Sequence, residues 1–228
     1  MTNDNNLPPP FDAFAETVGV PDPDLSLERA ALLVARSEYP SMDVDAYLGK
    51  LDALAAPLIE LREEEDALYR CNRLSQHLFD DLEFRGNASE YYDPRNSYLN
   101  EVIDRRLGIP ITLSLIYIEV GARLGIPLEG IGMPGHFLVR HREVADLYID
   151  PFHGGILLSA DECERRLRSV TGYGGPWEAT YLQPVSNREF LTRMLRNLYS
   201  IYTDDGDIER ANRIRDYAGV LIEGRLRQ

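Results

Sequence analysis

The sequence is poor in positive charge and has no long apolar run. It contains 24 lysine and arginine residues against 38 aspartate and glutamate residues, which gives a formal net charge of −14. This excess of negative charge repels nucleic-acid phosphates and anionic lipid headgroups. No apolar stretch approaches the roughly 18 residues that a membrane-spanning helix needs. We therefore expect neither a nucleic-acid partner nor a membrane partner.

Cysteine is also scarce, since Cys71 and Cys163 are the only two. They match no CxxC pattern, which indicates reduced structural thiols. Residues 1–10 are polar and then proline-rich, unlike the basic and apolar segments of a signal peptide. Together these features predict a cytoplasmic protein.

Phosphate-binding and hydrolase motifs are missing as well. The sequence has no Walker A motif, no GxGxxG between an expected strand and an expected helix, and no GxSxG nucleophile elbow. The glycine-rich stretch at 172–175 is too short to cradle a phosphate. We therefore expect no cofactor.

The first 85 residues predict a flexible arm followed by three helices. Residues 1–25 are rich in proline, aspartate and asparagine, which is typical of a loose arm with at most one short docking helix. Apolar residues then recur at helical spacing over 27–38, 44–56 and 63–82. We expect these helices to form an N-terminal subdomain over 26–85.

The third of these helices carries an apolar stripe with a histidine beside it. The stripe indicates the buried face of the helix, and it makes Cys71 a small core residue. His77 lies off the stripe, so we expect it at the surface. The stripe consists of Leu68, Cys71, Leu74, Leu78 and Leu82.

A buried helix and a small sheet follow in the region 86–185. Pro110 suits the first position of a helix, and residues 111–124 are apolar on nearly every face, as expected in the middle of a core. The period of the apolar residues then changes from 3.6 to two, which predicts antiparallel strands. A capped helix follows at 159–168. The sequence therefore predicts an α+β fold with a central helix packed on a small antiparallel sheet. The strand candidates are 128–133, 136–141 and 146–150.

The C-terminal region, 186–228, predicts a pair of helices joined at 204–207. The pair is similar to one tetratricopeptide-type repeat. Such arrays need about three units to bury their apolar faces. A single pair must therefore pack on the main domain or on a partner.

Several short motifs carry a family resemblance. The most specific are Gly-His-Phe-Leu-Val-Arg at 135–140 and Asp-Pro-Phe-His-Gly-Gly at 150–155, and Gly-Ile-Pro occurs at 108–110 and at 125–127. With these motifs, most of the chain resembles the SirB-type family of the transglutaminase-like superfamily, which has a papain-like fold. The resemblance implies a transglutaminase-like core with helical flanks.

In active members, the resemblance implies a Cys–His–Asp triad whose cysteine begins the central helix. A helix N-terminus lowers the pKa of a thiol there, the histidine takes its proton and the aspartate orients the imidazole ring. His136 and Asp150 match the last two positions. Counting about fifteen residues back from Gly125 places Pro110 at the cysteine position, and proline has no nucleophilic side chain.

The pairing of His136 with Asp150 depends on the hairpin between them. A loop of odd length centred on Glu143 places the two residues directly opposite each other, with their side chains on one face. An even-length loop without a bulge would place them on opposite faces. The pair either forms a catalytic dyad or staples the hairpin.

Three residues could replace the missing thiol. Thr112 and Ser114 lie one turn into the central helix, where a hydroxyl could face His136, although an alcohol gains less than a thiol from a helix N-terminus. Thr112 could equally cap the helix. Cys71 would have to arrive from a different helix, where we expect it in the core.

A metal site is the other chemical option. His136, His141, Asp150 and His153 are ligand types that zinc accepts, but they lie in no known ligand spacing. We therefore expect no metal.

The sequence leaves two hypotheses for the function. The first is a non-catalytic binding or regulatory module with a protein or peptide partner. The second is a peptide or amide hydrolase, or an acyl-transferase, that uses Thr112 or Ser114 with His136 and Asp150. Three further polar residues could line a groove around His136 and Asp150: Asn100, Arg105 and Glu119. They could also simply be solvated at the surface or cap a helix.

Overall fold

The computed structural model describes residues 10–226, the side chains of 170, 171 and 223–226 excepted. These residues form helices around a small sheet, which confirms the expected α+β class. The α-helices are α1 (Pro10–Val18), α2 (Leu27–Arg36), α3 (Val44–Ala55), α4 (Ala67–Ser75), α5 (Leu99–Arg105), α6 (Pro110–Arg123), α7 (Ala160–Thr171), α8 (Asn187–Asp204) and α9 (Ile208–Leu226). The strands are β1 (Arg85–Gly86), β2 (Leu107–Gly108), β3 (Leu128–Ile131), β4 (Leu138–His141), β5 (Tyr148–Asp150) and β6 (Ile156–Leu158).

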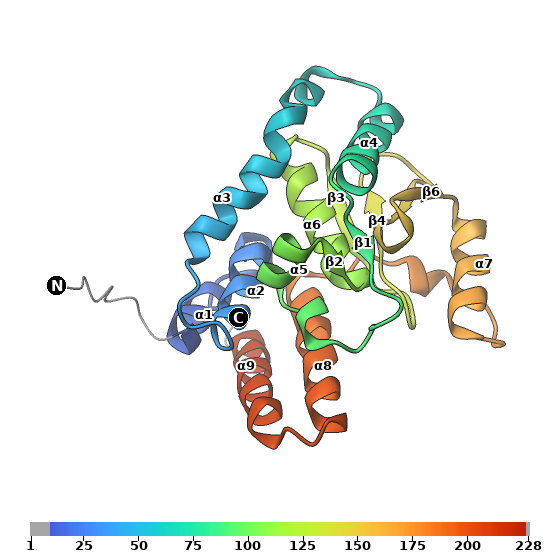
Figure 1. Ribbon diagram of the computed structural model, residues 1–228. Coiled ribbons are helices and arrows are strands. Elements are labelled where there is room, and N and C mark those ends of the chain that lie inside the picture. The colour runs from blue at the N-terminus through green and yellow to red at the C-terminus, as the bar shows by residue number, and fades with distance from the viewer. Residues whose placement is uncertain (1–9, 227–228) are drawn as a thin grey trace.

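Helix α6 is the centre of the core, as its apolar sequence indicated. Pro110 is its first residue, a position at which a helix needs no N–H donor. The side chains of Ile111, Leu113 and Leu115 are buried. Gly125 follows the end of the helix and turns the chain toward β3. Figure 1 shows α6 enclosed by α3, α5 and the sheet.

A four-stranded antiparallel sheet packs on α6 in the order β3-β4-β5-β6. Alternate residues of its strands face opposite sides. Val139 and Ile149 belong to the core around α6, while Leu138 and Tyr148 belong to a second core against α7. The strand β6 was not foreseen, because its three residues are too few to show a period. The sheet is therefore covered on both faces, with α7 on the side away from α6 (Figure 1).

The hairpin between β4 and β5 has a register that differs from the expected one. Arg140 pairs with Tyr148, so the loop is centred one residue later than we expected. The direct pairing of His136 with Asp150 was therefore wrong. A shift of two positions preserves the alternation of side chains, and the two side chains still meet. Periodicity cannot detect such a shift, because the pattern itself repeats every two residues.

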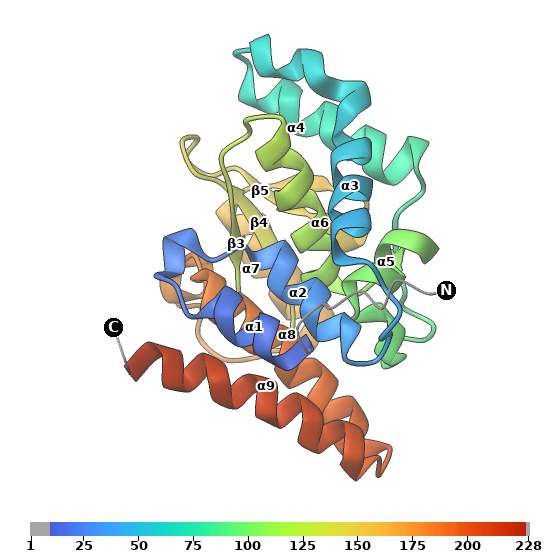
Figure 2. The same cartoon turned by 90° about the vertical axis from the view of Figure 1, so that its left-hand side faces the viewer.

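Residues 10–24, which we expected in a flexible arm, pack on the rest of the chain. Helix α1 contacts both α2 and α9 (Figure 2), and its Phe14 and Val18 side chains are fully buried. Phe14 lies edge-on to Tyr217 with 4.8 Å between the ring centroids. Helix α1 is the one short docking helix that we allowed in this arm, and its buried apolar residues share one helical face. Residues 1–9 of the expected arm lie outside the described residues.

The third expected helix is broken into pieces. A 3₁₀ helix (Ala56–Glu63) precedes α4, and a π-helical turn (Gln76–Asp81) follows it. In this wider turn His77 points inward, and its Nε2 donates to the carbonyl oxygen of Leu54 at 2.9 Å. The expectation of a surface His77 was therefore wrong. Leu68, which we expected in the core, is 50 % exposed.

The C-terminal helices α8 and α9 pack against each other and against the N-terminal helices, at the end of the molecule opposite α4 (Figures 1 and 2). Ser186 and Glu189 form a capping box at the start of α8. The likeness of the pair to a tetratricopeptide repeat and the division of the chain into four segments remain predictions. In the described part of the chain, no helix is both long and apolar enough to cross a membrane.

Candidate functional site

The side chains of His136 and Asp150 meet in the interior of the fold. His136 Nε2 lies 2.9 Å from Asp150 Oδ2, and both side chains are at most 1 % exposed. His136 lies just before β4, and Asp150 is the last residue of β5. Because the carboxylate accepts the Nε2–H, the other ring nitrogen, Nδ1, is the one that could act as a base.

A second histidine shares the same carboxylate oxygen. His153 Nδ1 lies 2.9 Å from Asp150 Oδ2, and the backbone N–H of His153 donates to Asp150 Oδ1 at 3.3 Å. Asp150 is thereby the N-cap of the 3₁₀ helix Pro151–His153. The left-handed residues Gly154 and Gly155 then close the turn. A carboxylate with a histidine three residues later was the signal in the sequence that could have revealed this contact.

Asp150 also lies close to a cation. Arg166 of α7 places its Nε 3.4 Å from Asp150 Oδ2. Burial by itself raises the pKa of Asp150, but the hydrogen bonds from His136 and His153 outweigh it and hold this pKa well below its ordinary value. The cluster is therefore an ionised carboxylate surrounded by nitrogen donors. Sequence reasoning missed Arg166 because a helical pattern does not show which neighbour a side chain contacts.

Neighbouring side chains hold His136 in place. The Phe152 ring lies edge-on to the imidazole, with 6.2 Å between the centroids, and Tyr91 packs edge-on against Phe152 at the same distance. Arg193 of α8 donates to the carbonyl oxygens of Met133 and His136 at 2.7 and 2.8 Å. These residues come from remote parts of the chain, so no local pattern could have indicated them.

The two hydroxyls that we considered as nucleophiles have other surroundings. Thr112 Oγ1 donates to the carbonyl oxygen of Asn96 at 2.8 Å and accepts from the N–H of Ile109 at 3.1 Å, so it caps α6. Ser114 Oγ is buried and has no hydrogen-bond partner among the described residues. Among the side chains that the structure describes, no hydroxyl or thiol hydrogen-bonds to the His136 ring.

Both thiols are poorly suited to nucleophilic chemistry. Cys71 and Cys163 are fully buried and form no disulfide. Burial raises the pKa of Cys71 to about 11 and that of Cys163 to about 12. Both are therefore protonated at neutral pH, and a protonated thiol is a weak nucleophile.

Comparison with known proteins connects this arrangement to a family. A family model described as the transglutaminase-like superfamily matches residues 45–196. The chain belongs to this superfamily. A UPF0162 protein of Xylella fastidiosa is 45 % identical over 207 residues, which cover 86 % of this chain and 72 % of that protein. A UPF0162 protein of Pseudomonas aeruginosa is 32 % identical over 183 residues, or 80 % of this chain and 67 % of that protein.

A longer animal protein contains a similar region. F-box only protein 21 of Mus musculus is 36 % identical over 148 residues, which are 61 % of this chain but only 23 % of that protein. No solved structure matches the chain. The closer assignment to a SirB-type family remains a prediction.

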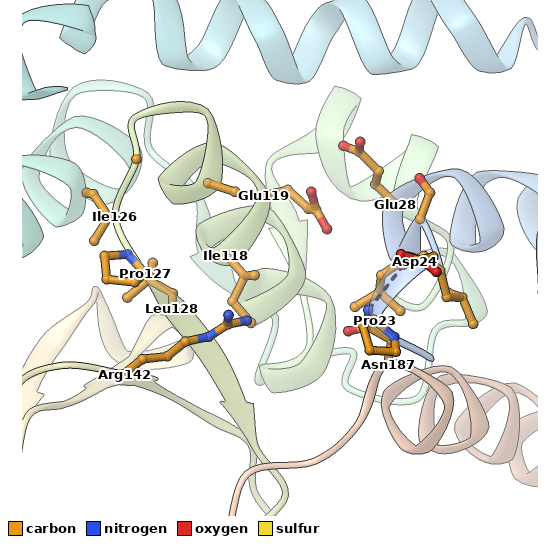
Figure 3. Close-up of a pocket in the computed structure, with 15 residues that line it drawn as sticks. Pro23, Asp24, Glu28, Ile118, Glu119, Ile126, Pro127, Leu128, Arg142 and Asn187 are labelled. Carbon is orange, nitrogen blue, oxygen red and sulfur yellow. Dashed lines mark hydrogen bonds between the residues drawn. The ribbon is translucent and has the colours of Figure 1, made fainter. Parts of the chain in front are cut away.

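The transglutaminase-like fold also has a cavity of about 630 Å³ that His136 does not line. Figure 3 shows Glu119 of α6 pointing toward Glu28 of α2, with Arg142 on the opposite wall. Arg123 Nη2 pairs with Glu28 at 2.8 Å. Burial, followed by the neighbouring charge of Glu28, raises the pKa of Glu119 to about 8. Arg123 Nη1, which lies 3.5 Å from Glu119 Oε2, offsets this rise only in part, so Glu119 takes up its proton at a higher pH than an ordinary glutamate does.

The remaining polar candidates lie outside the Asp150 cluster. Glu119 lines the cavity of Figure 3 instead. Asn100 is buried and its Oδ1 has no hydrogen-bond partner among the described residues, while Arg105 pairs with Asp93 at 3.6 Å. His141 Nδ1 accepts from backbone N–H groups of its own hairpin loop. The structure thus brings together three of the four residues that we considered as metal ligands: His136, Asp150 and His153.

A larger cavity, of about 860 Å³, lies beside the turn that precedes His136. It lies between this turn and the helices α8 and α9. Gly135 lines it on one side, and Arg193, Arg196 and Ile222 line it on the other. Arg196 and Ile222 are exposed, so both a positive charge and an apolar side chain are available to a bound molecule.

Proposed function

We propose that this transglutaminase-like chain is a non-catalytic binding or regulatory module for a protein or peptide partner. The observation that carries the proposal is Pro110 at the first position of α6, where the family resemblance implies the nucleophilic cysteine. Proline supplies no nucleophilic side chain and no backbone N–H at that position. In this proposal, the pair of His136 and Asp150 holds the hairpin in shape and activates no nucleophile.

The surroundings of the other candidate nucleophiles support the proposal. The Thr112 hydroxyl is used as a cap of α6, and both thiols have raised pKa values. A base can activate a nucleophile only when the two groups are within hydrogen-bonding distance in the working complex. The Thr112 hydroxyl donates its proton to the carbonyl oxygen of Asn96, so this bond would have to break before a base could take the proton.

The cavity between the turn that precedes His136 and the helices α8 and α9 is where we expect the partner to bind. Three arginines (Arg188, Arg193 and Arg196) line it against two acidic residues (Asp22 and Glu189). With the exposed Ile222, this lining suits a peptide with an acidic and an apolar residue. The similar region in F-box only protein 21 is 23 % of a longer protein, which supports the interpretation as a module within larger assemblies.

The second hypothesis, a hydrolase or acyl-transferase, retains one supporting observation. Ser114 Oγ is buried and has no hydrogen-bond partner among the described residues, so its proton is not committed to another acceptor. A reaction there would need a path from solvent, because Ser114 is fully buried. The hypothesis therefore requires an opening of the fold that the non-catalytic proposal does not.

Restoring the missing thiol tests the proposal. We expect the unmodified chain to show no labelling by acylating probes that depends on His136. In the variant Pro110→Cys, the new thiol at the start of α6 should react with iodoacetamide at pH 7 about tenfold faster than in the double variant Pro110→Cys/His136→Ala. The double variant is the matched control, since it has the same thiol and lacks only the base.

Two results would count against the proposal. Labelling of Thr112 or Ser114 in the unmodified chain, abolished by His136→Ala, would show that the site is catalytic. Equal alkylation rates in the single and double variants would show that position 110 does not face His136, and the argument from Pro110 would fail. Circular dichroism of each variant checks that the fold is retained.

A further inference from the structure

We propose that His136, Asp150 and His153 form a binding site for one divalent transition-metal ion, with Zn²⁺ as the best match. The ligand atoms are His136 Nε2, Asp150 Oδ2 and His153 Nδ1, and all lie within 4.8 Å of one another. Two imidazoles and one carboxylate are a common ligand set for zinc with one open position. The site needs no nucleophile, so the inference does not rest on the proposed function.

Two of the three distances between the ligand atoms are close to those of a metal site, and the two nitrogens lie at most 4.8 Å apart. Each imidazole nitrogen lies 2.9 Å from Asp150 Oδ2. In a tetrahedral zinc site with bonds of about 2.05 Å, neighbouring ligand atoms lie about 3.3 Å apart. Each nitrogen must therefore move away from the oxygen by only a few tenths of an ångström. The ion then replaces two N–H protons between the same three atoms.

The orientation of the two imidazole rings also fits. Their centroids are 5.6 Å apart, and the ring planes are tilted by 56°. Two imidazoles on one tetrahedral zinc ion place their centroids about 5 Å apart, because each centroid lies roughly 1 Å beyond its ligand nitrogen. Hydrogen bonds to a single oxygen have thus brought the two rings to nearly the separation that ligands of one ion have.

One side of the cluster is enclosed by the fold, and the other is accessible to solvent. His136 and Asp150 are at most 1 % exposed, while 35 % of the His153 side chain is exposed. The backbone of His153 is held by the turn that Asp150 caps, so only its ring has to adjust. The exposed side of His153 admits the ion, and it leaves room for a water molecule as the fourth ligand.

Arg166 opposes the metal. Its Nε lies 3.4 Å from Asp150 Oδ2, so its positive charge is close to the position of the ion. Like charges at such distances repel, and the repulsion is strongest where the surroundings exclude water. Removing this charge should therefore strengthen metal binding, whereas an ion held by acidic residues elsewhere on the surface would not respond. Arg166 gives a test that is specific to the cluster.

Competition with a chromophoric zinc chelator at pH 7.5 measures the affinity. We expect the full chain to bind one equivalent of Zn²⁺, and His153→Gln to weaken this binding by about 100-fold or more. His77→Gln removes a buried histidine outside the cluster and serves as the matched control, with unchanged affinity. Co²⁺ in place of Zn²⁺ should give the intense visible absorption of a tetrahedral site, and His153→Gln should abolish it.

Arg166→Gln provides the second variant, in case the loss of His153 disturbs the turn. It should raise the affinity for Zn²⁺ by about threefold to tenfold. Equal affinities of the unmodified chain and His153→Gln, or no response to Arg166→Gln, would overturn the proposed site. Failure of the zinc experiment leaves the alkylation experiment on Pro110→Cys unaffected, and the reverse also holds.

Discussion

Asp150 is fully buried and Glu119 is half-buried on the wall of a cavity, and the pKa values of the two carboxyl groups are shifted in opposite directions. Asp150 receives hydrogen bonds from two histidines, so its pKa lies below the ordinary range. Glu119 faces a second carboxylate, that of Glu28, and its pKa is raised to about 8. Burial raises the pKa in both cases, so the neighbours decide the protonation state.

The comparison also separates two ways of building a polar site inside a fold. The Asp150 cluster comes from one hairpin and the turn that follows it, so its geometry depends on a few backbone positions. The pair of Glu119 and Glu28 joins two helices, α6 and α2, across a cavity (Figure 3). We expect the first site to respond strongly to substitutions in its turn, and the second to respond chiefly to pH.

The largest effect should come from removing the Asp150 carboxylate. Asp150→Ala leaves the buried imidazole of His136 and the partly exposed imidazole of His153 without their acceptor, and it removes the cap of the following turn. We expect a loss of roughly 3 kcal/mol in the free energy of unfolding, measured by urea denaturation. Asp45→Ala is the control, since Asp45 is 78 % exposed in its ion pair with Arg29 and should cost less than about 1 kcal/mol. Similar losses in the free energy of unfolding of the two variants would mean that the Asp150 cluster contributes no more to stability than an exposed ion pair.

A pair of neighbouring glycines tests how far the Asp150 site depends on its turn. Gly154 and Gly155 have φ angles of +75° and +69°. A Cβ at Gly155 would lie 2.5 Å from Ser75 Oγ and 2.6 Å from the Phe79 ring, whereas a Cβ at Gly154 would meet nothing within 4 Å. Gly154→Ala should cost about 1 kcal/mol for its left-handed backbone, and Gly155→Ala about 2–3 kcal/mol.

Thermal and urea unfolding of both glycine variants measure the difference. The Gly154→Ala variant serves as the control for the backbone term, because both residues have left-handed φ angles. Equal losses of stability would mean that Ser75 and Phe79 move aside for the added methyl group with no cost in free energy. The zinc affinity of each variant shows whether the turn also sets the position of His153.

The smallest of the three effects concerns the pH dependence that Glu119 contributes. The folded chain keeps the Glu119 proton up to a pKa of about 8, whereas the unfolded chain loses it near the ordinary value of 4.5. Folding is therefore linked to proton binding between these values, and the contribution of Glu119 to stability falls as pH rises from 4.5 to about 8. Glu119→Gln removes this dependence.

Urea denaturation at pH 5, 7 and 9 measures the effect of Glu119→Gln. The stability of the variant relative to the unmodified chain should increase with pH by on the order of 1–3 kcal/mol. The control is Glu209→Gln, because Glu209 is 87 % exposed and should show no such trend. A difference that stays constant with pH would mean that Glu119 is ionised in the folded chain, and the contrast with Asp150 would disappear.

Local sequence patterns predicted the central elements well. Pro110 begins α6, Ser159 caps α7 as expected, and the apolar residues of α6 are buried. These features depend on neighbours within a few residues, where helical periodicity and capping chemistry act directly. The Transglutaminase-like assignment could also be made from short motifs, and the family comparison supports it.

Features that depend on contacts between distant segments were missed or misplaced. The inward orientation of His77 follows from a π-helical turn, and the packing of Phe14 depends on α9 at the other end of the chain. Arg166 and Arg193 reach the site from helices whose periodicity predicts a buried face but not a particular partner. The two-residue error in the hairpin register has the same origin, since alternation specifies a face and not a pairing.

The sequence by itself determined the central helix, the types of residue near its start and the presence of Pro110 where the resemblance implies a cysteine. Only the tertiary structure decided that His153 shares the oxygen of Asp150 with His136, and that Glu119 faces Glu28. The physical reason is that short-range patterns set helices, caps and strand faces, whereas the charge state of a buried group depends on neighbours that the chain brings together only when it folds.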